Sequence, residues 1–433
     1  MTDARRSTLL LVLGSALLVG ALAARLPVSL DGQDSVNFAL ALVEFDPRVE
    51  QPHFPGYPLY VALCRALRGL GLSEPLALAL PGVLAAAALA PCTALVARRL
   101  GLPPTARALA VLLLVTHPLL LAEGPRPMPD LLGTCALWGT FALVLAERPF
   151  AAGLLFAALL GIRVDLAPCA VGLVAVAPGA RSRLVRGLVC GIAVWLPLAL
   201  VAYPPGSLPA LVEFGIGHFT IWGSSALAGA GDTGAALWNL HALGPGVAAL
   251  GLGLVGLRRA PREARRALAL ALAPYLVWLS VGQNLANARH LLPLVPACAL
   301  LAGHGLASLA TTAQRTAGAL ALALLALPAF HPLLEPPLDG RAAVLRAVRE
   351  CGDCLAVYAG PEERLFEHYA PAGFPAYRRA SIASIRRDLQ AWQIGRAQVL
   401  VTSGVSGAAS YGPAVAHLGR GLELYRIETA ALR

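Results

Sequence analysis

The stretch from Leu76 to Ala97 reads LALALPGVLAAAALAPCTALVA and contains no charged side chain. An α-helix needs about 20 predominantly apolar residues to cross the hydrocarbon core of a bilayer. Arg98 and Arg99 follow directly, and positively charged residues at the end of a span help to orient it. This stretch therefore predicts a membrane-spanning helix.

The same pattern recurs along most of the chain. Apolar residues make up 57% of the sequence and charged residues 13%, and the mean hydropathy is +0.68. Soluble globular domains carry about a quarter charged residues, so lipid must cover much of this chain. We predict an all-α polytopic membrane bundle of about 11 transmembrane helices over residues 1–332. The further candidate runs are 8–28, 104–122, 130–147, 149–162, 164–180, 186–203, 236–257, 267–283, 291–309 and 316–332.

The basic residues exclude some functions. The formal net charge is +10, and the sequence contains no lysine. A Walker-type phosphate loop and a Schiff-base enzyme both need a lysine, which argues against an ATP-driven pump. Much of the positive charge lies in short loops between apolar runs, where it serves orientation and does not indicate a nucleic-acid partner.

These arginines fall on one side of the membrane if the predicted helices alternate in direction. The positive-inside rule assigns that side to the cytoplasm. We therefore predict a multi-pass protein of the bacterial cytoplasmic (inner) membrane, with a cytoplasmic N-terminus and a C-terminal domain outside. The arginines are Arg5, Arg6, Arg98, Arg99, Arg107, Arg148, Arg181, Arg183, Arg186, Arg258, Arg259, Arg262, Arg265, Arg266 and Arg315.

Residues 333–433 are more polar than the rest and predict a small soluble domain. Leu355–Tyr358 and Gln398–Thr402 are short β-branched runs with helical patterns between and before them, which indicates an α/β fold. Cys351 and Cys354 form a C-x-x-C pair in this domain. Outside the cytoplasm we expect them to form a local disulfide, and no two further ligands are spaced to complete a zinc site.

The first outer loop, residues 31–73, is the segment richest in chemical groups. Five carboxylates accompany a single nearby cation, Arg48. A carboxylate near an apolar boundary can act as a general base, and two close ones could hold a divalent metal cation. Asp34 also precedes a helical stretch, Ser35–Phe45, so it could be only an N-cap. That stretch and a second one, Tyr57–Leu70, are amphipathic and are predicted to lie on the membrane surface.

The loop resembles that of the GT-C superfamily of membrane glycosyltransferases, which includes protein O-mannosyltransferases and bacterial aminoarabinose transferases. Asp34-Ser-Val-Asn-Phe-Ala39 stands where the family has Asp-Glu-x-x-Tyr-Ala, and His53-Phe-Pro-Gly-Tyr57-Pro-Leu59 stands where it has His-Pro-Pro-Gly-Tyr-Pro-Leu. Ser35 replaces the usual second acid, which puts a metal-binding acidic pair in doubt, although Asp31 could substitute.

The resemblance implies an inverting glycosyltransferase of GT-C fold. In that family a loop carboxylate takes the proton from an acceptor hydroxyl, which attacks a sugar carried on polyprenyl phosphate. Asp34 would be this base, with Asp31 second or assisting. The implied partners are a polyprenyl-phosphate sugar donor, the lipid bilayer, and an acceptor that is a protein, a lipid or a polysaccharide. The resemblance indicates no certain cofactor, and it leaves a divalent metal cation open.

Further candidates for binding the lipid phosphate or substrate lie in later loops. Asn287-Ala-Arg289-His290-Leu-Leu-Pro293 resembles the family's Arg-Tyr-Leu-Leu-Pro segment, and an arginine fork suits phosphate. The alternative is that Arg289 and His290 only reach the headgroup level. His53 and Tyr57 of the first loop are also candidates. The remaining candidates are Arg126 and Asp130 in the short outer loop 123–130, and Arg163 in the segment 161–165.

Two of these assignments have plainer alternatives. Arg163 and Asp165 could form only a local ion pair that closes a helix turn, although ionisable residues at membrane depth are usually functional. His218 to Gly223, which includes Trp222, could be an interfacial aromatic anchor and not a sugar or prenyl contact.

Three other functions compete with the transferase. A transporter or flippase would show inverted repeats and broken helices that meet at the midplane, and none is evident. A polysaccharide polymerase or ligase that uses lipid-linked substrates would gather its functional residues in a large late loop. A non-catalytic membrane scaffold would leave the acidic first loop unexplained.

Overall fold

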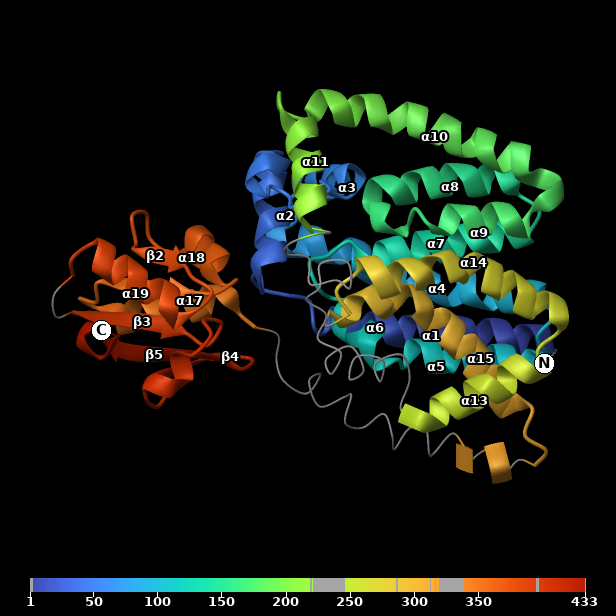
Figure 1. Ribbon diagram of the computed structural model, residues 1–433. Helices are drawn as coiled ribbons and strands as arrows, with labels where there is room; N and C mark the ends of the chain where they lie inside the picture. The colour runs from blue at the N-terminus through green and yellow to red at the C-terminus, as the bar shows by residue number, and fades with distance from the viewer. Residues whose placement is uncertain are drawn as a thin grey trace.

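The computed structural model describes residues 3–218, 220, 246–285, 287–311, 313–315, 317–318, 338–394 and 397–432. Long helices lie side by side in a bundle, and a small domain with a β-sheet adjoins one end of it (Figure 1). The predicted combination of a helical membrane bundle and a C-terminal α/β domain is therefore present.

The bundle contains helices from both halves of the chain. Its core is apolar and is built largely of leucine and alanine, with the buried Trp138 and Tyr275 among them. The helices of the bundle are α1 (Asp3–Ala23), α4 (Glu74–Arg99), α5 (Pro104–Val115), α6 (Pro118–Glu123), α7 (Asp130–Leu145), α8 (Pro149–Ile162), α9 (Cys169–Val176), α10 (Arg181–Ala202), α11 (Ser207–Gly217), α13 (Gly246–Arg259), α14 (Arg262–Gly282) and α15 (Val295–Ala307).

Four helical segments of the described chain are long and apolar enough to cross a membrane. Five shorter apolar helices accompany them, so the predicted total of about 11 spans stays a prediction. All but two residues of the run at 316–332 and the first part of the run at 236–257 lie outside the described residues. The four long segments are Glu74–Arg99, Pro178–Ala202, Arg262–Gly282 and Ala288–Ala307.

Prolines divide two of the predicted runs. The run at 104–122 forms α5 and then α6, which begins at Pro118. The run at 164–180 contains only the short α9, between Pro168 and the 3₁₀ turn that starts at Pro178. Proline lacks an N–H and disfavours helix in the preceding residue, so an uninterrupted helix is not available in either run.

The first loop contains two helices, as its apolar spacing predicted. They are α2 (Gln33–Val43) and α3 (Pro58–Gly69), joined by a segment with a 3₁₀ turn, η1 (Pro47–Val49). Phe38 and Tyr60 are fully buried between them, with ring centroids 5.0 Å apart in an edge-on arrangement. This packing fixes the face of α2 that carries Asp34.

The C-terminal domain has a five-stranded sheet of order β2-β1-β3-β5-β4, in which β1 runs parallel to β2 and β3, and β5 antiparallel to β3 and β4. The predicted strands correspond to β1 and β3, and the other three were not predicted. The strands are β1 (Ala356–Ala359), β2 (Ala376–Arg378), β3 (Gln398–Thr402), β4 (Ala416–Gly419) and β5 (Leu422–Glu428). The helices are α17 (Gly340–Cys351), α18 (Glu363–Tyr369) and α19 (Ile382–Ala391).

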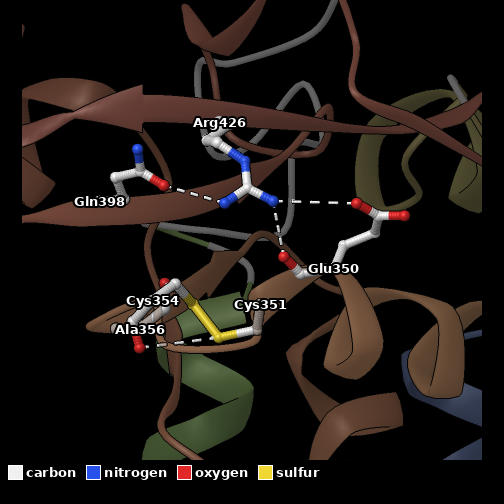
Figure 2. The surroundings of a disulfide bond; sticks show 6 residues. All are labelled: Glu350, Cys351, Cys354, Ala356, Gln398 and Arg426. Atoms are coloured by element: carbon white, nitrogen blue, oxygen red, sulfur yellow. Dashed lines mark hydrogen bonds and ion pairs between the residues drawn. A yellow bond between two sulfur atoms is a disulfide. The ribbon is translucent and has the colours of Figure 1, made fainter.

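The predicted disulfide between Cys351 and Cys354 is present at the end of α17 (Figure 2). Beside it, Arg426 of β5 donates hydrogen bonds to the side chain of Gln398 and to the main-chain carbonyl of Glu350. The disulfide thus lies where α17 meets the sheet. One hydrophobic core includes this region together with α2 and α3 of the first loop, so the domain is packed against the loop.

Candidate active site

A cavity of about 580 Å³ opens between the first loop, the bundle and the C-terminal domain. The first loop lines it with Asp34 and the segment from His53 to Tyr57. The bundle lines it with the turn from Arg163 to Pro168 and with residues at the end of α14. The cavity is therefore formed by segments that are distant in the sequence.

Asp34 lies on the cavity wall, in the first turn of α2. Its Oδ2 atom accepts a hydrogen bond from Nη2 of Arg289 at 2.6 Å, and 32% of its side chain stays exposed. The N-cap of α2 is Gly32. Asp34 is therefore an ion-paired cavity residue, and the interpretation of it as only an N-cap is wrong.

His53 is the second neighbour of Asp34. Its Nδ1 atom lies 3.8 Å from Oδ1 of Asp34, and its ring packs edge-on against Phe38 and Tyr57, with centroids 5.1 Å away in each case. Gly56, in the same segment, has φ +105°, and a Cβ there would collide with the Tyr203 hydroxyl. Tyr203 also donates a hydrogen bond to the carbonyl of Pro55 at 3.2 Å, so the end of α10 holds this segment.

The charges around Asp34 keep it ionised. Burial alone would raise the pKa of its carboxyl, but the positive groups around it lower that pKa well below its usual range. Burial lowers the pKa of His53, so at neutral pH the His53 ring is uncharged. His53 lowers the pKa of Asp34 when its ring is protonated, and Arg289 lowers that pKa with a permanent charge and a hydrogen bond, so at neutral pH Asp34 is a carboxylate.

A second charged group lies beneath this pair. Arg163, with a side chain 7% exposed, makes ion pairs with Asp165 and with the buried Asp130 at the start of α7. Nε of Arg289 is 3.9 Å from Oδ1 of Asp130, which links the two groups. The local ion pair that is the plainer alternative for Arg163 and Asp165 is present, and Asp130 extends it into a network at the cavity, so the substrate-binding assignment of Arg163 stays a prediction.

Gly133 makes room for this network. It lies one turn after Asp130 on α7, and a Cβ at this position would be 2.6 Å from Cγ of Arg163. The stem of Arg163 therefore packs directly against the backbone of α7. The sequence Asp130-Leu-Leu-Gly133 supplies both the carboxylate and the space for its cation.

The segment that carries Arg289 and His290 is held by hydrogen bonds from neighbouring helices. It is a 3₁₀ helix, η6 (Ala288–Leu294), in front of α15. Trp138 donates to the carbonyl of Pro293 at 3.0 Å, and Tyr275 donates to the carbonyl of His290 at 2.7 Å. With its amide oxygen turned toward Arg289, Asn287 accepts from Nε at 2.9 Å and from Nη2 at 3.2 Å.

Asp31 and Arg126 form a separate pair. Nε of Arg126 donates to Oδ2 of Asp31 at 3.1 Å, and its Nη1 donates to Glu123. Ser35, which stands where the GT-C motif has its second acid, accepts hydrogen bonds from the amides of Asp31 and Gly32. It is buried and stabilises the start of α2, so it contributes no ligand to the cavity.

The predicted site residues divide into three groups. Asp34, His53, Tyr57, Arg163 and His290 line the cavity, whereas Asp130 and Arg289 pair with lining residues, and the backbone of Asn287 hydrogen-bonds to the lining residues Asn284 and His290. Asp31 and Arg126 lie in neither group. Of the predicted His218 segment, His218 lines the cavity and Trp222 lies outside the described residues.

Sequence reasoning missed several lining residues. Trp278, Gln283 and Asn284 at the end of α14 could have been noted as polar or aromatic residues that end an apolar run. Glu50 was seen only as one of five loop carboxylates. Arg378 of the C-terminal domain carries no local signal.

The acidic residues do not converge as a metal site would require. Asp34 and Asp31 each pair with a different arginine, and the second acid of the motif is a serine that binds the backbone. Among the residues that the structure describes, no group of three or more His, Cys, Asp or Glu is placed to hold a metal ion. We therefore assign no catalytic step to a metal.

Comparison with known proteins finds similar architectures only among solved structures. No family model and no curated protein matches the chain. Among solved structures, ArnT from Cupriavidus metallidurans bound to undecaprenyl phosphate is similar over 95% of this chain and 97% of its own, with TM-score 0.54 and 13% identity. The Archaeoglobus fulgidus oligosaccharyltransferase is similar over 92% of this chain and 69% of its own, with TM-score 0.52 and 13% identity.

Arabinofuranosyltransferase AftD from Mycobacteria is similar over 93% of this chain, with TM-score 0.52 and 14% identity. This chain spans only 35% of that larger protein. All three structures are GT-C glycosyltransferases. At this low identity the likeness establishes the fold and agrees with the motifs of the first loop. This chain has the GT-C fold.

Proposed function

We propose that the protein is an inverting glycosyltransferase that moves a sugar from a polyprenyl-phosphate donor to an acceptor at the outer face of the cytoplasmic membrane. The observation that carries the proposal is the ionised carboxylate of Asp34 on a cavity wall between bundle and loop. The GT-C fold supports it, because the similar structures are glycosyltransferases, one of them bound to undecaprenyl phosphate.

The proposed reaction is a single displacement. An acceptor hydroxyl donates its proton to Asp34, and its oxygen forms a bond to the anomeric carbon of the donor sugar. The bond from that carbon to the phosphate oxygen breaks, and the polyprenyl phosphate leaves with the electron pair. Attack opposite to the leaving group inverts the anomeric configuration. His53 packs edge-on against Phe38 and holds its Nδ1 atom beside the carboxylate of Asp34.

The leaving phosphate needs positive charge or hydrogen-bond donors on the bundle side. His290 and Arg163 line that side, and Arg289 lies directly behind Asp34. Trp278 lines the same side and offers an apolar surface for the first isoprene units. Arg163 and Arg289 are already paired with carboxylates, so their net attraction for phosphate depends on these pairs opening or being shared.

The arrangement of the chain supports an outer site. The N-terminus and the arginine-rich connection between α13 and α14 lie at one end of the bundle, and α2, α3 and the C-terminal domain at the other (Figure 1). If the arginine-rich end is cytoplasmic, the cavity opens outside. No nucleotide sugar is present there, so a lipid must carry the donor across.

One experiment tests the transferase directly. The gene is deleted, and the glycans, glycolipids and polyprenyl-phosphate sugars of the strain are compared with the parent by mass spectrometry. We expect one glycosylated product to disappear and one polyprenyl-phosphate sugar to accumulate. Complementation with the unaltered gene restores both. If the glycans, glycolipids and polyprenyl-phosphate sugars are unchanged, the proposal is wrong. If the deletion strain instead fails to transport an intact lipid-linked sugar across the membrane, the protein is a flippase.

A further inference from the structure

The C-terminal domain contributes a residue to the cavity. Arg378, the last residue of β2, lines it together with residues of the first loop and the bundle. Nη2 of Arg378 donates a hydrogen bond to Oε1 of Gln33 at 3.3 Å, and Gln33 is the residue before Asp34. The cavity is thus completed by a strand that follows Asp34 by more than three hundred positions.

This placement rests on a well-packed interface. Ser29 donates to the Asp339 carboxylate at 2.7 Å, and the amide of Leu30 donates to the Tyr369 hydroxyl at 2.9 Å. Arg364 of α18 donates to the carbonyl of Val49 at 2.9 Å. Apolar residues of α2, α17 and α18 share one buried core across the same boundary. Arg378 is therefore held at the cavity by the fold of the domain.

The charge of Arg378 is less compensated than that of the other arginine on the cavity wall. Arg163 pairs with Asp130 and Asp165, whereas among the described residues Arg378 makes no ion pair within 4.0 Å, and the carboxylate that it influences, Glu363, acts on it only at longer range. Glu50, which also lines the cavity, accepts hydrogen bonds from Gln33 and Asn37 and pairs with Arg364 at 3.9 Å. One long bond to an amide oxygen leaves most of the guanidinium donors of Arg378 available to a ligand.

The position in the cavity indicates which substrate Arg378 meets. Arg163, Trp278 and His290 line the cavity from the bundle, which is the part of the protein that contains the candidate membrane spans. Gln33, Glu50 and Arg378 come from the first loop and the soluble domain. Asp34 is next to Gln33, so a group bound at Arg378 would be close to the base that activates the acceptor.

We propose that Arg378 binds an oxyanion, a phosphate or a carboxylate, on the acceptor, and that the C-terminal domain thereby completes the acceptor half of the site. A planar guanidinium with free donors matches such a group in geometry and charge. This inference rests on the proposed transferase function, because it takes Asp34 as the base. It adds that the acceptor is anionic near the hydroxyl that reacts.

The test is a binding experiment with full-length protein in nanodiscs of neutral phosphatidylcholine. Dihexanoyl phosphatidylglycerol is the anionic lipid probe, glycerophosphoglycerol the same phosphodiester without acyl chains, and dihexanoylglycerol the neutral control, each titrated by calorimetry against empty discs. We expect the parent to prefer a phosphate probe over the neutral one by at least about tenfold, the usual effect of one charge-assisted hydrogen bond. Tighter binding of the probe with acyl chains indicates a lipid acceptor, and tighter binding of the probe without them indicates a soluble acceptor.

Variants assign the preference to Arg378. Arg378→Gln should weaken binding of the preferred phosphate about tenfold, and Arg378→Lys should retain most of it. Arg387→Gln is the matched control, because Arg387 is an exposed arginine of the same domain that does not line the cavity. Equal binding by parent and Arg378→Gln, or equal loss in the Arg387→Gln control, overturns the inference.

A last arm separates the two substrates. Undecaprenyl phosphate is titrated into the same proteins, and Arg378→Gln should bind it as the parent does. If this variant loses undecaprenyl phosphate instead, Arg378 belongs to the donor side and the inference fails. Because none of these titrations needs turnover, their outcome is independent of the deletion experiment that tests the transferase itself.

Discussion

Nη2 of Arg289 lies 2.6 Å from Oδ2 of Asp34 and joins two residues that are 255 positions apart in the sequence. The pair connects the first loop to η6, in front of α15. Arg289 is itself held by the Asn287 amide, so the orientation of the carboxylate is set from the bundle side. A base fixed in this way needs little reorganisation when an acceptor arrives.

Asp34→Asn should abolish most of the transfer. The amide keeps the size of the side chain but cannot take a proton, so we expect kcat to fall about a hundredfold to ten-thousandfold. The measurement is transfer from the accumulated polyprenyl-phosphate sugar identified in the deletion strain, with purified protein in liposomes. Full activity of Asp34→Asn would remove this residue from the mechanism.

Asp31→Asn is the control for that experiment. Asp31 pairs with Arg126, away from the cavity lining, so the substitution should alter stability more than catalysis. We expect kcat within about a factor of ten of the parent, well above that of the Asp34 variant. A larger loss in Asp31→Asn than in Asp34→Asn would exchange their roles.

Arg289→Gln should change the pH dependence of the reaction. In the parent the lowered pKa of Asp34 keeps the base ionised through mildly acidic pH, so kcat/KM stays flat there. Without Arg289 the burial of Asp34 remains and its pKa rises, so the loss of activity on acidification begins at higher pH. The check is a pH profile of kcat/KM.

Arg289→Lys serves as the comparison, because it keeps a positive charge beside Asp34. On acidification, kcat/KM of Arg289→Lys should begin to fall at a pH closer to that of the parent than kcat/KM of Arg289→Gln does. If the two variants have the same profile as the parent, Arg289 does not control the ionisation of Asp34, and the pair serves orientation alone.

Gly133→Ala should disturb the network around Arg163. The new methyl group would lie 2.6 Å from Cγ and 3.0 Å from Cβ of Arg163, so the side chain must move away from Asp130. Overpacking of this kind costs about 1–3 kcal/mol. We expect a lower thermal unfolding temperature and weaker binding of undecaprenyl phosphate. Gly20→Ala, where a Cβ meets no atom within 4 Å, should change neither.

The helices of the bundle and of the first loop could be predicted from the sequence, because both depend on local patterns. Uncharged runs such as Leu76–Ala97 contain their own evidence for a membrane helix, and the spacing of Asp34 to Leu59 matches a known motif. The base candidate and the helices α2 and α3 could therefore be predicted. Arg289, the ion-pair partner of Asp34, is singled out only because its own distant segment, Asn287–Pro293, resembles a second motif of the family.

The rest of the site depends on tertiary placement. Asp130, Arg163 and Asp165 form one network only because α7 and the end of α8 lie together, with Gly133 between them. Arg378 stands in a three-residue strand with no β-branched residue, so neither β2 nor its role was predictable. In β5 the consecutive residues Leu424 and Tyr425 are both buried, which interrupts the alternation of apolar and polar residues by which a strand is predicted.

The sidedness of the chain gives a last prediction. Arg387→Cys places a thiol on the exposed face of α19, and Arg262→Cys places one at the start of α14, the arginine-rich end. In a variant without the six free cysteines, a membrane-impermeant maleimide should label the Arg387→Cys protein in intact spheroplasts. The Arg262→Cys protein should react only after the membrane is permeabilised, because positively charged ends are retained in the cytoplasm. The reverse pattern would place the cavity inside, where nucleotide sugars are available and a lipid-linked donor would not be required.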